Sequence, residues 1–255
     1  MFILLLISLS LASRIGIISA MDEELALIKQ NMIVEKTDTI ARRVYLTGKL
    51  YGMDCTCVIA GVGEINAALT AEILVSHYHV DAVIFSGVAG GINPELRIGD
   101  IVISKKVLHH DYGLIAPDNF SPFDTIGFAA DSFLVETSVE AAKRVEFAVI
   151  PSTISSSQPH TPICVIGRVA TGDQFIASEE KRKWLEKTFA ADCVEMEGVA
   201  VAQVCAINKV PFVIIRCLSD QANEKADVDF EAFLPYAVKN SSLLVGEIVR
   251  SLHNN

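Results

Sequence analysis

The chain has 255 residues, of which 51% are hydrophobic and 20% are charged, so it can bury a sizeable core and is not expected to be disordered. Its length fits one large α/β domain. The net charge is −10, and no Lys/Arg cluster is long enough to follow a phosphate backbone, which makes nucleic acid a poor candidate partner.

Residues 1–13 are predicted to lie outside the folded domain. Residues 2–12 form an almost unbroken apolar run, too short to span a bilayer comfortably and of the length of a signal-peptide core. Ser10-Leu11-Ala12 supplies small residues for cleavage, although no Lys or Arg precedes the run. We therefore expect a signal peptide over 1–13 and a single domain over 14–255.

Removal of this leader would leave a periplasmic or secreted protein with no stable membrane association. The alternative is an uncleaved anchor, or a fortuitous extension on a cytoplasmic protein. The six cysteines favour that alternative. Cys55 and Cys57 alternate along one predicted strand, the others lie singly in apolar runs, and none forms a CxxC pair. Buried free thiols are expected, and these are more usual in a reducing compartment.

Strands and helices alternate along most of the chain. Strands are predicted over 14–19, 43–50, 53–60, 82–86, 100–108, 163–170 and 211–218. Helices are predicted over 22–31, 65–78, 131–145, 179–188, 200–207 and 229–252, with Ser178 as the N-cap of the fourth. Between them lie a long irregular region over 109–128 and a Ser/Pro-rich loop over 151–162.

This alternation predicts an α/β fold with a mixed, largely parallel central sheet. A hairpin at Tyr51-Gly52 argues against a barrel of eight equal repeats. In such folds, ligands bind beyond the carboxyl ends of the strands. The segments that converge there are 21–24, 61–63, 87–91, 171–176, 195–197 and 219–220.

Two of these segments have features of a ligand pocket. The glycine-rich run 87–91 allows the backbone to approach a ligand, although a plain tight turn needs the same residues. It matches neither GxGxxG nor the P-loop pattern, so a dinucleotide or triphosphate role is not supported. In 171–176, Phe175 could stack on a flat base or simply fill the core.

Carboxylates at the ends of apolar runs suggest acid–base chemistry. Asp220 ends a hydrophobic strand, where burial can raise its pKa into the range of a general acid, but it could equally cap the next turn. Glu195 and Glu197 would share one face of an extended segment. Arg216 could form a plain ion pair with Asp220. Two carboxyl groups in different environments are what cleavage of a glycosidic bond requires.

The histidines do not predict a metal site or a catalytic relay. His77 and His79 form an HxH pair with no third ligand nearby, which is typical of a surface. In His109-His110-Asp111, neighbouring side chains on a strand point opposite ways, so they cannot line up as a relay.

Five segments taken in order resemble the bacterial 5′-methylthioadenosine/S-adenosylhomocysteine nucleosidases, members of the purine nucleoside phosphorylase superfamily. They are 16–24 (GIISAMDEE), 87–91 (GVAGG), 172–176 (GDQFI), 194–197 (VEME) and 218–220 (LSD). The resemblance implies a homodimeric three-layer α/β/α sandwich without metal or organic cofactor. It also implies hydrolysis of the adenine–ribose bond in methylthioadenosine and adenosylhomocysteine, and in 5′-deoxyadenosine too.

The resemblance assigns roles by position. Glu24 would activate the attacking water, Asp220 would protonate adenine at N7, and Arg216 would help to fix the water. Residues assigned to substrate binding are Met196 and Glu197 at the ribose, Gly90 at the ribosyl site, Phe175 and the Ile176 backbone at adenine, Met21, Val62 and Phe230 at the 5′-alkylthio group, and Ser219. The partner subunit's 109–128 loop would complete the pocket. Val88 stands where some relatives carry a hydroxyl residue, so one polar contact near the sugar would be missing.

Two other functions remain open. A phosphorylase of the same fold would attack with phosphate, but the loop Met21-Asp22-Glu23-Glu24 is acidic where phosphate needs cations or helix N–H donors. An exported, non-catalytic nucleoside binder would explain the leader, but it would need neither Glu24 nor Asp220.

Overall fold

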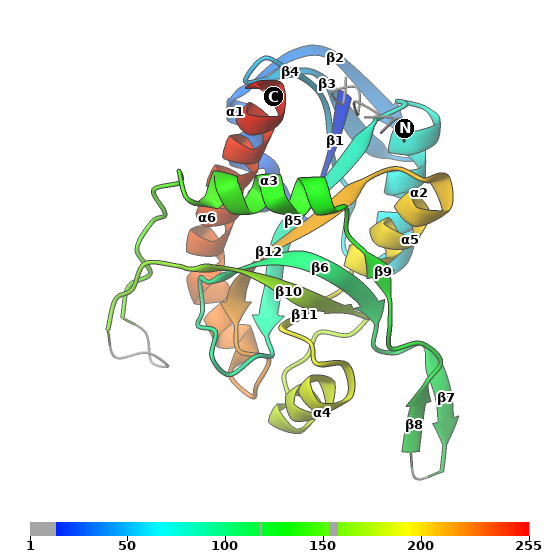
Figure 1. The fold of residues 1–255 in the computed structure, drawn as a ribbon, viewed down its shortest axis with the longest axis vertical. Coiled ribbons are helices and arrows are strands. Elements are labelled where there is room, and N and C mark those ends of the chain that lie inside the picture. Colours follow the sequence, from blue (N-terminus) through cyan, green and yellow to red (C-terminus); the bar gives the residue numbers. More distant parts are fainter. Residues whose placement is uncertain (1–13, 118, 153–157, 255) are drawn as a thin grey trace, which may run out of the picture.

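The computed structural model describes residues 14–117, 119–152 and 158–254 (Figure 1). The predicted leader lies outside these residues, as does the middle of the predicted 151–162 loop. Among the described helices, none is both long enough and apolar enough to cross a membrane.

The first half of the chain carries most of the sheet. Its elements are β1 (Arg14–Ser19), α1 (Asp22–Gln30), β2 (Met32–Ile40), β3 (Arg43–Leu50), β4 (Met53–Ile59), α2 (Glu64–Ser76), β5 (Ala82–Gly91) and β6 (Ile101–His109). The second half contributes β7 (Gly113–Ala116), β8 (Asn119–Pro122), β9 (Phe128–Ala129), α3 (Ser132–Ala142), β10 (Cys164–Thr171), α4 (Glu179–Phe189), β11 (Cys193–Glu195), α5 (Gly198–Asn208), β12 (Phe212–Asp220) and α6 (Ala226–Asn254).

The central sheet is mixed, as predicted. Its order is β11-β10-β6-β12-β5-β1-β4-β3-β2, with β9 added at β6. The strands β4, β1, β5 and β12 run parallel, whereas β6 is antiparallel to β12, and β3 is antiparallel to both β2 and β4. The short strand β11 pairs with β10 and also with the end of β5. This second pairing places the carboxylate-rich 195–197 segment beside the glycine-rich end of β5.

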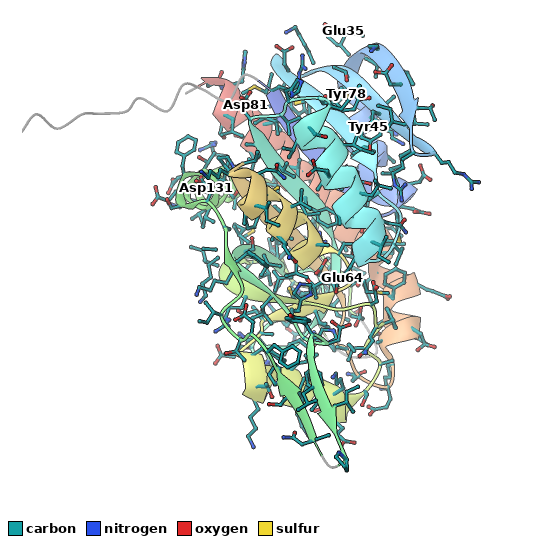
Figure 2. The ribbon with its side chains drawn as sticks, turned by 90° about the vertical axis from the view of Figure 1, so that its right-hand side faces the viewer. Glu35, Tyr45, Glu64, Tyr78, Asp81 and Asp131 are labelled. Atoms are coloured by element: carbon teal, nitrogen blue, oxygen red, sulfur yellow. The ribbon has the colours of Figure 1, made fainter. Side chains whose placement is uncertain are left out.

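Helices cover both faces of the sheet (Figure 1). One face carries α1, α3 and α6, and the other carries α2 and α5. Side chains of β1 pack into both cores. Ile15 and Ile17 lie in the core beneath α1, α3 and α6, whereas Ile18 lies in the core beneath α2 and α5. Tyr45 of β3 stacks on Tyr78, which follows α2, with ring centroids 4.9 Å apart (Figure 2). The arrangement confirms the three-layer α/β/α sandwich.

The fold differs from the sequence-based expectation in several places, among them the short strand β11, for which no strand was predicted. Strand β2 was not expected, because this edge strand is paired only with β3 and is mostly exposed, so it has no apolar alternation. Strand β5 continues to Gly91, since its glycines pair with β12 and β11 instead of forming a loop. The region 109–128 contains the β7–β8 hairpin and is not wholly irregular.

Candidate active site

A cavity opens beyond the carboxyl ends of β1, β5, β11 and β12, where ligands of such sheets are expected. Every residue that the resemblance assigned to the site lines this cavity, with the exception of Arg216. The lining residues are Ala20, Met21, Glu24, Val62, Val88, Ala89, Gly90, Gln174, Phe175, Ile176, Val194, Glu195, Met196, Glu197, Ser219, Asp220 and Phe230.

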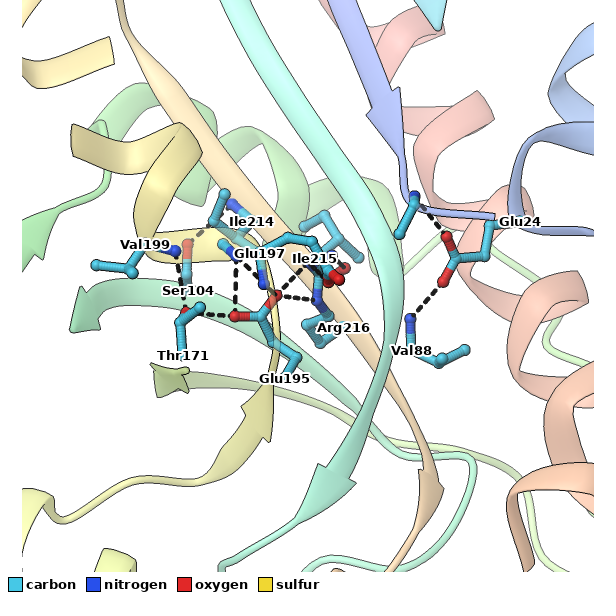
Figure 3. Close-up of polar contacts among 12 residues, drawn as sticks. Glu24, Val88, Ser104, Thr171, Glu195, Glu197, Val199, Ile214, Ile215 and Arg216 are labelled. Atoms are coloured by element: carbon cyan, nitrogen blue, oxygen red, sulfur yellow. Dashed lines mark hydrogen bonds and ion pairs between the residues drawn. The ribbon is translucent and has the colours of Figure 1, made fainter. Parts of the chain in front are cut away.

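Glu24 is held by backbone amides at the start of α1. One carboxylate oxygen accepts from the N–H groups of Ala20 (2.7 Å) and Met21 (2.9 Å), and the other accepts from Val88 N–H (3.1 Å), as Figure 3 shows in part. Glu24 is therefore the N3 residue of α1, and its side chain supplies one half of a capping box by accepting from the N–H of the N-cap residue Met21. Burial raises its pKa, while Arg216 and the three N–H donors oppose that rise. A carboxylate oriented in this way can act as a general base when ionised.

Asp220 closes strand β12 and is 2% exposed. Ser219 Oγ donates to one of its oxygens (2.9 Å), and Ala222 N–H donates to the other (2.8 Å). The hydrogen bond from Ala222 N–H shows that Asp220 caps the turn after β12, which the sequence analysis gave as the alternative to an acid role. Burial raises the pKa of Asp220 to about 6, which is the condition for a general acid working near neutral pH. Capping and acid chemistry are therefore compatible here.

Glycines of β5 allow both carboxylates to lie against the same strand. A Cβ on Gly87 would come within 2.9 Å of Glu24 Oε1, and a Cβ on Gly90 would come within 2.8 Å of Asp220 Oδ1. Three residues of extended chain span roughly 10 Å. Glu24 and Asp220 thus enter one cavity at two separated points. In inverting glycosidases the acid and the base are likewise separated, with about 6.5–9.5 Å between their carboxyl groups.

Glu195 and Glu197 do not share one face of an extended segment, so that expectation is wrong. Strand β11 ends at Glu195, and Glu197 is the N-cap of α5. Glu197 Oε1 accepts from Gly63 N–H (2.9 Å). Burial, followed by the negative charge of Glu195, raises the pKa of Glu197 to about 7.

Arg216 lies behind the cavity wall and is 1% exposed. Its guanidinium stacks on Phe85, 4.1 Å from the ring centroid, and its Nη2 lies 2.5 Å from Glu195 Oε2 and 3.9 Å from Glu197 Oε2 (Figure 3). Its ion pair is with Glu195, not with Asp220. Its assignment to the attacking water stays a prediction.

Aromatic and apolar residues form the remainder of the wall. Phe175 is 51% exposed, so it is not simply a core residue, and it meets Phe230 edge to face with ring centroids 6.0 Å apart. The resemblance gave no individual role to Ala20, Ala89, Gln174, Val194 or Glu195, which also line the cavity. Each of them lies within one of the motifs that carry the resemblance, so membership of a motif was the available signal.

The histidine-rich segment 109–111 lies outside this cavity. His109 contacts Glu64 through Nδ1 (3.2 Å) and Gln203 through Nε2 (3.4 Å), whereas His110 is fully buried, so the two rings point different ways as expected. Donor atoms of Glu64, His109 and Asp111 lie within 4.8 Å of one another. His109 and Asp111 are already hydrogen-bonded, Asp111 to Asp173 N–H (3.1 Å), so the group is accounted for as a hydrogen-bonded cluster.

Comparison with known proteins agrees with this geometry. The family described as "Phosphorylase superfamily" matches residues 14–250. The 5′-methylthioadenosine/S-adenosylhomocysteine nucleosidase of Tolumonas auensis is 36% identical, over 94% of this chain and all of the relative. A nucleosidase of the same description from Neisseria meningitidis, solved with methylthio-immucillin-A, superposes with a TM-score of 0.82 at 33% identity, covering 94% and 99% of the two chains. The Colwellia psychrerythraea nucleosidase, solved with adenine, also gives 0.82 at 33% identity, covering 94% and 96%.

Fold and cavity thus define an α/β protein of the phosphorylase superfamily. Within that superfamily, the chain belongs to the 5′-methylthioadenosine/S-adenosylhomocysteine nucleosidases.

Proposed function

We propose that this protein hydrolyses the N-glycosidic bond of 5′-methylthioadenosine and S-adenosylhomocysteine, and also of 5′-deoxyadenosine. The products are adenine and the 5-substituted ribose. The observation that carries the proposal is the entry of Asp220 and Glu24 into one cavity from two separated points along β5.

The two carboxyl groups take complementary roles. Adenine is a poor leaving group as an anion, so Asp220 protonates it at N7 while the ribosyl ring becomes oxocarbenium-like. Glu24 accepts a proton from the water that attacks the opposite face of the sugar. Ionised Glu24 and Glu197 stabilise positive charge that develops only in the transition state.

The other walls account for recognition of the substrate. Phe175 stacks on adenine and the Ile176 backbone bonds its edge, while Met196 and Glu197 hold the ribose. Gly90 lines the ribosyl site, and the absence of a side chain there leaves room for the carboxyl group of Asp220. Met21, Val62 and Phe230 offer an apolar surface to the 5′-alkylthio group.

Attack by phosphate is disfavoured by the charge of the cavity. Four carboxyl groups line it, those of Glu24, Glu195, Glu197 and Asp220, and none of its lining residues is Lys or Arg. The buried guanidinium of Arg216 is already paired with Glu195. A phosphate in this partly dry site would be repelled by several kcal/mol.

Adenine release is therefore expected to be independent of phosphate. Purified protein would be incubated with 5′-methylthioadenosine, S-adenosylhomocysteine, 5′-deoxyadenosine and inosine, with and without added phosphate, and the free base measured. Release that requires phosphate would identify a phosphorylase. Saturable binding of methylthioadenosine without adenine release would identify a non-catalytic binder.

We also propose a homodimer whose interface contains the β7–β8 hairpin and the exposed side of α2. These elements lie on the same side of the molecule (Figures 1 and 2). Helix α2 exposes Ile65 and Leu69, and the hairpin exposes Leu114 and Ile115. The segments that flank the hairpin add the exposed residues Tyr112, Phe123 and Ile126. Such a row of exposed apolar side chains is typical of an interaction surface. The partner's 109–128 loop would then complete the 5′ end of the pocket.

Ile115→Lys is expected to shift the protein from dimer to monomer, because Ile115 is 83% exposed and a charge there would have to be buried on association. Light scattering at several concentrations would measure the mass. Ile33→Lys, on the exposed edge strand β2, is the matched control and should stay dimeric. A monomeric wild-type protein would contradict the proposal.

Export of the protein is proposed from the composition of residues 2–12 alone. All six cysteines are free thiols in the structure, five of them buried, as predicted. N-terminal sequencing of native material is expected to begin after Ala12. A native protein that retains residue 2 would contradict cleavage of the leader.

A further inference from the structure

Glu195 lines the cavity, but its carboxylate is occupied by the protein. One oxygen accepts from Arg216 Nε (3.2 Å) and Nη2 (2.5 Å), and the same oxygen accepts from Glu197 N–H (3.1 Å). Gly198 N–H reaches both oxygens, at 2.9 and 2.8 Å. The hydroxyl of Thr171 donates to the other oxygen. No acceptor capacity remains for a substrate hydroxyl.

Glu197 is in the opposite situation. Its Oε1 accepts one N–H, from Gly63, and its Oε2 lies 3.9 Å from Arg216 Nη2, too far for a hydrogen bond. Acceptor capacity therefore remains on a carboxylate that faces the cavity. The two glutamates differ by two positions in sequence, yet one is fully engaged and the other is available.

The guanidinium of Arg216 interacts electrostatically with three buried carboxylates. Glu24, Glu195 and Glu197 are each at most 6% exposed, and Arg216 is 1% exposed. A buried guanidinium that lost its closest carboxylate would pair with the next one, because an unpaired buried charge is costly. Glu197 is the next carboxylate along the same Nη2.

We propose that Glu195 is a positioning residue that acts through Glu197. Its carboxylate holds Arg216 away from Glu197 and fixes the first turn of α5 through the N–H groups of Glu197 and Gly198. Glu197 is thereby kept free to accept from a ribose hydroxyl. This inference rests on the proposed function, since it concerns how the ribose of the nucleoside is held.

The test pairs two variants with three substrates. Glu195→Gln and Glu197→Gln would be assayed on 5′-methylthioadenosine and on its 2′-deoxy and 3′-deoxy counterparts, each relative to wild type. Glu197→Gln should lose most of its penalty on the counterpart that lacks the hydroxyl Glu197 accepts from. Glu195→Gln is expected to lower kcat/KM on the parent by at least about 10-fold and on that same counterpart by no more than about 3-fold.

The control is Glu180→Gln, an exposed carboxylate in the first turn of α4, which should match wild type on all three substrates. An equal penalty of Glu195→Gln on every substrate would show that Glu195 only supports the fold, and would overturn the inference. Glu195→Asp keeps the charge and should show the same pattern more weakly if the glutamine variant does not fold. Failure of both variants to fold would also overturn it. Absence of adenine release by wild type would instead reject the proposed function.

Discussion

Asp220→Asn is expected to lower kcat by about 10²–10⁴-fold, because asparagine cannot deliver a proton to adenine N7. The pocket should stay intact, since an amide oxygen can still accept from Ala222 N–H or Ser219 Oγ. The measurement is the rate of adenine release at saturating 5′-methylthioadenosine, together with the affinity for that substrate. Asp227→Asn, an exposed carboxylate in the first turn of α6, is the matched control. Turnover like that of wild type would remove Asp220 from the acid role.

Loss of activity in Asp220→Asn should not come with loss of stability. Burial raises the pKa of Asp220 from 3.8 to about 6, so the folded state binds this proton more tightly than the unfolded state. The stabilisation from the protonated carboxyl is complete below pH 4 and is lost as the pH rises through 6. At pH 8 burial of the ionised carboxylate lowers the free energy of unfolding by at most about 3 kcal/mol, relative to the protonated form. The variant should therefore unfold at least as high in temperature as wild type at pH 8.

Glu24→Gln is the second large expected effect. Glutamine keeps one oxygen for the backbone amides of Ala20 and Met21 or of Val88, but it cannot take a proton from water. We expect kcat to fall by about 10²–10⁴-fold while the affinity for 5′-methylthioadenosine changes little. Glu23→Gln, an exposed neighbour in the same turn, should match wild type. A weaker affinity with unchanged kcat would reassign Glu24 to substrate binding.

The fold was predictable where local pattern and tertiary context agree. Strand β1 and helix α1 follow from a buried apolar run and from acids at a helix N-terminus. Ser178 was predicted as the cap of α4, and its side chain does accept from Lys181 N–H. Strand β2 could not be predicted, because an exposed edge strand is ordered by pairing with β3 and not by its own apolar period.

The residues that form the site were predictable from the sequence, but the hydrogen bonds and ion pairs among them were not. Carboxylates and glycines at the ends of strands converge on one cavity because those ends meet at the same edge of a sheet. The partner of Arg216 was not predictable, since it depends on β11 lying beside β5 and on α5 beginning at Gly198, three residues after Glu195. The spacing of Glu195 and Glu197 by two residues suggested that their side chains share one face of a strand. They do not, because the strand ends at Glu195 and the chain turns before Glu197.

A crystal structure with bound methylthio-immucillin-A would test the central arrangement most directly. We expect a carboxylate oxygen of Asp220 about 2.6–3.2 Å from the N7 position of the base. We also expect Glu24 on the opposite side of the sugar-like ring, bonded to a water placed for attack. A base that does not contact Asp220, or a ring with both carboxylates on one side, would contradict the proposed hydrolysis.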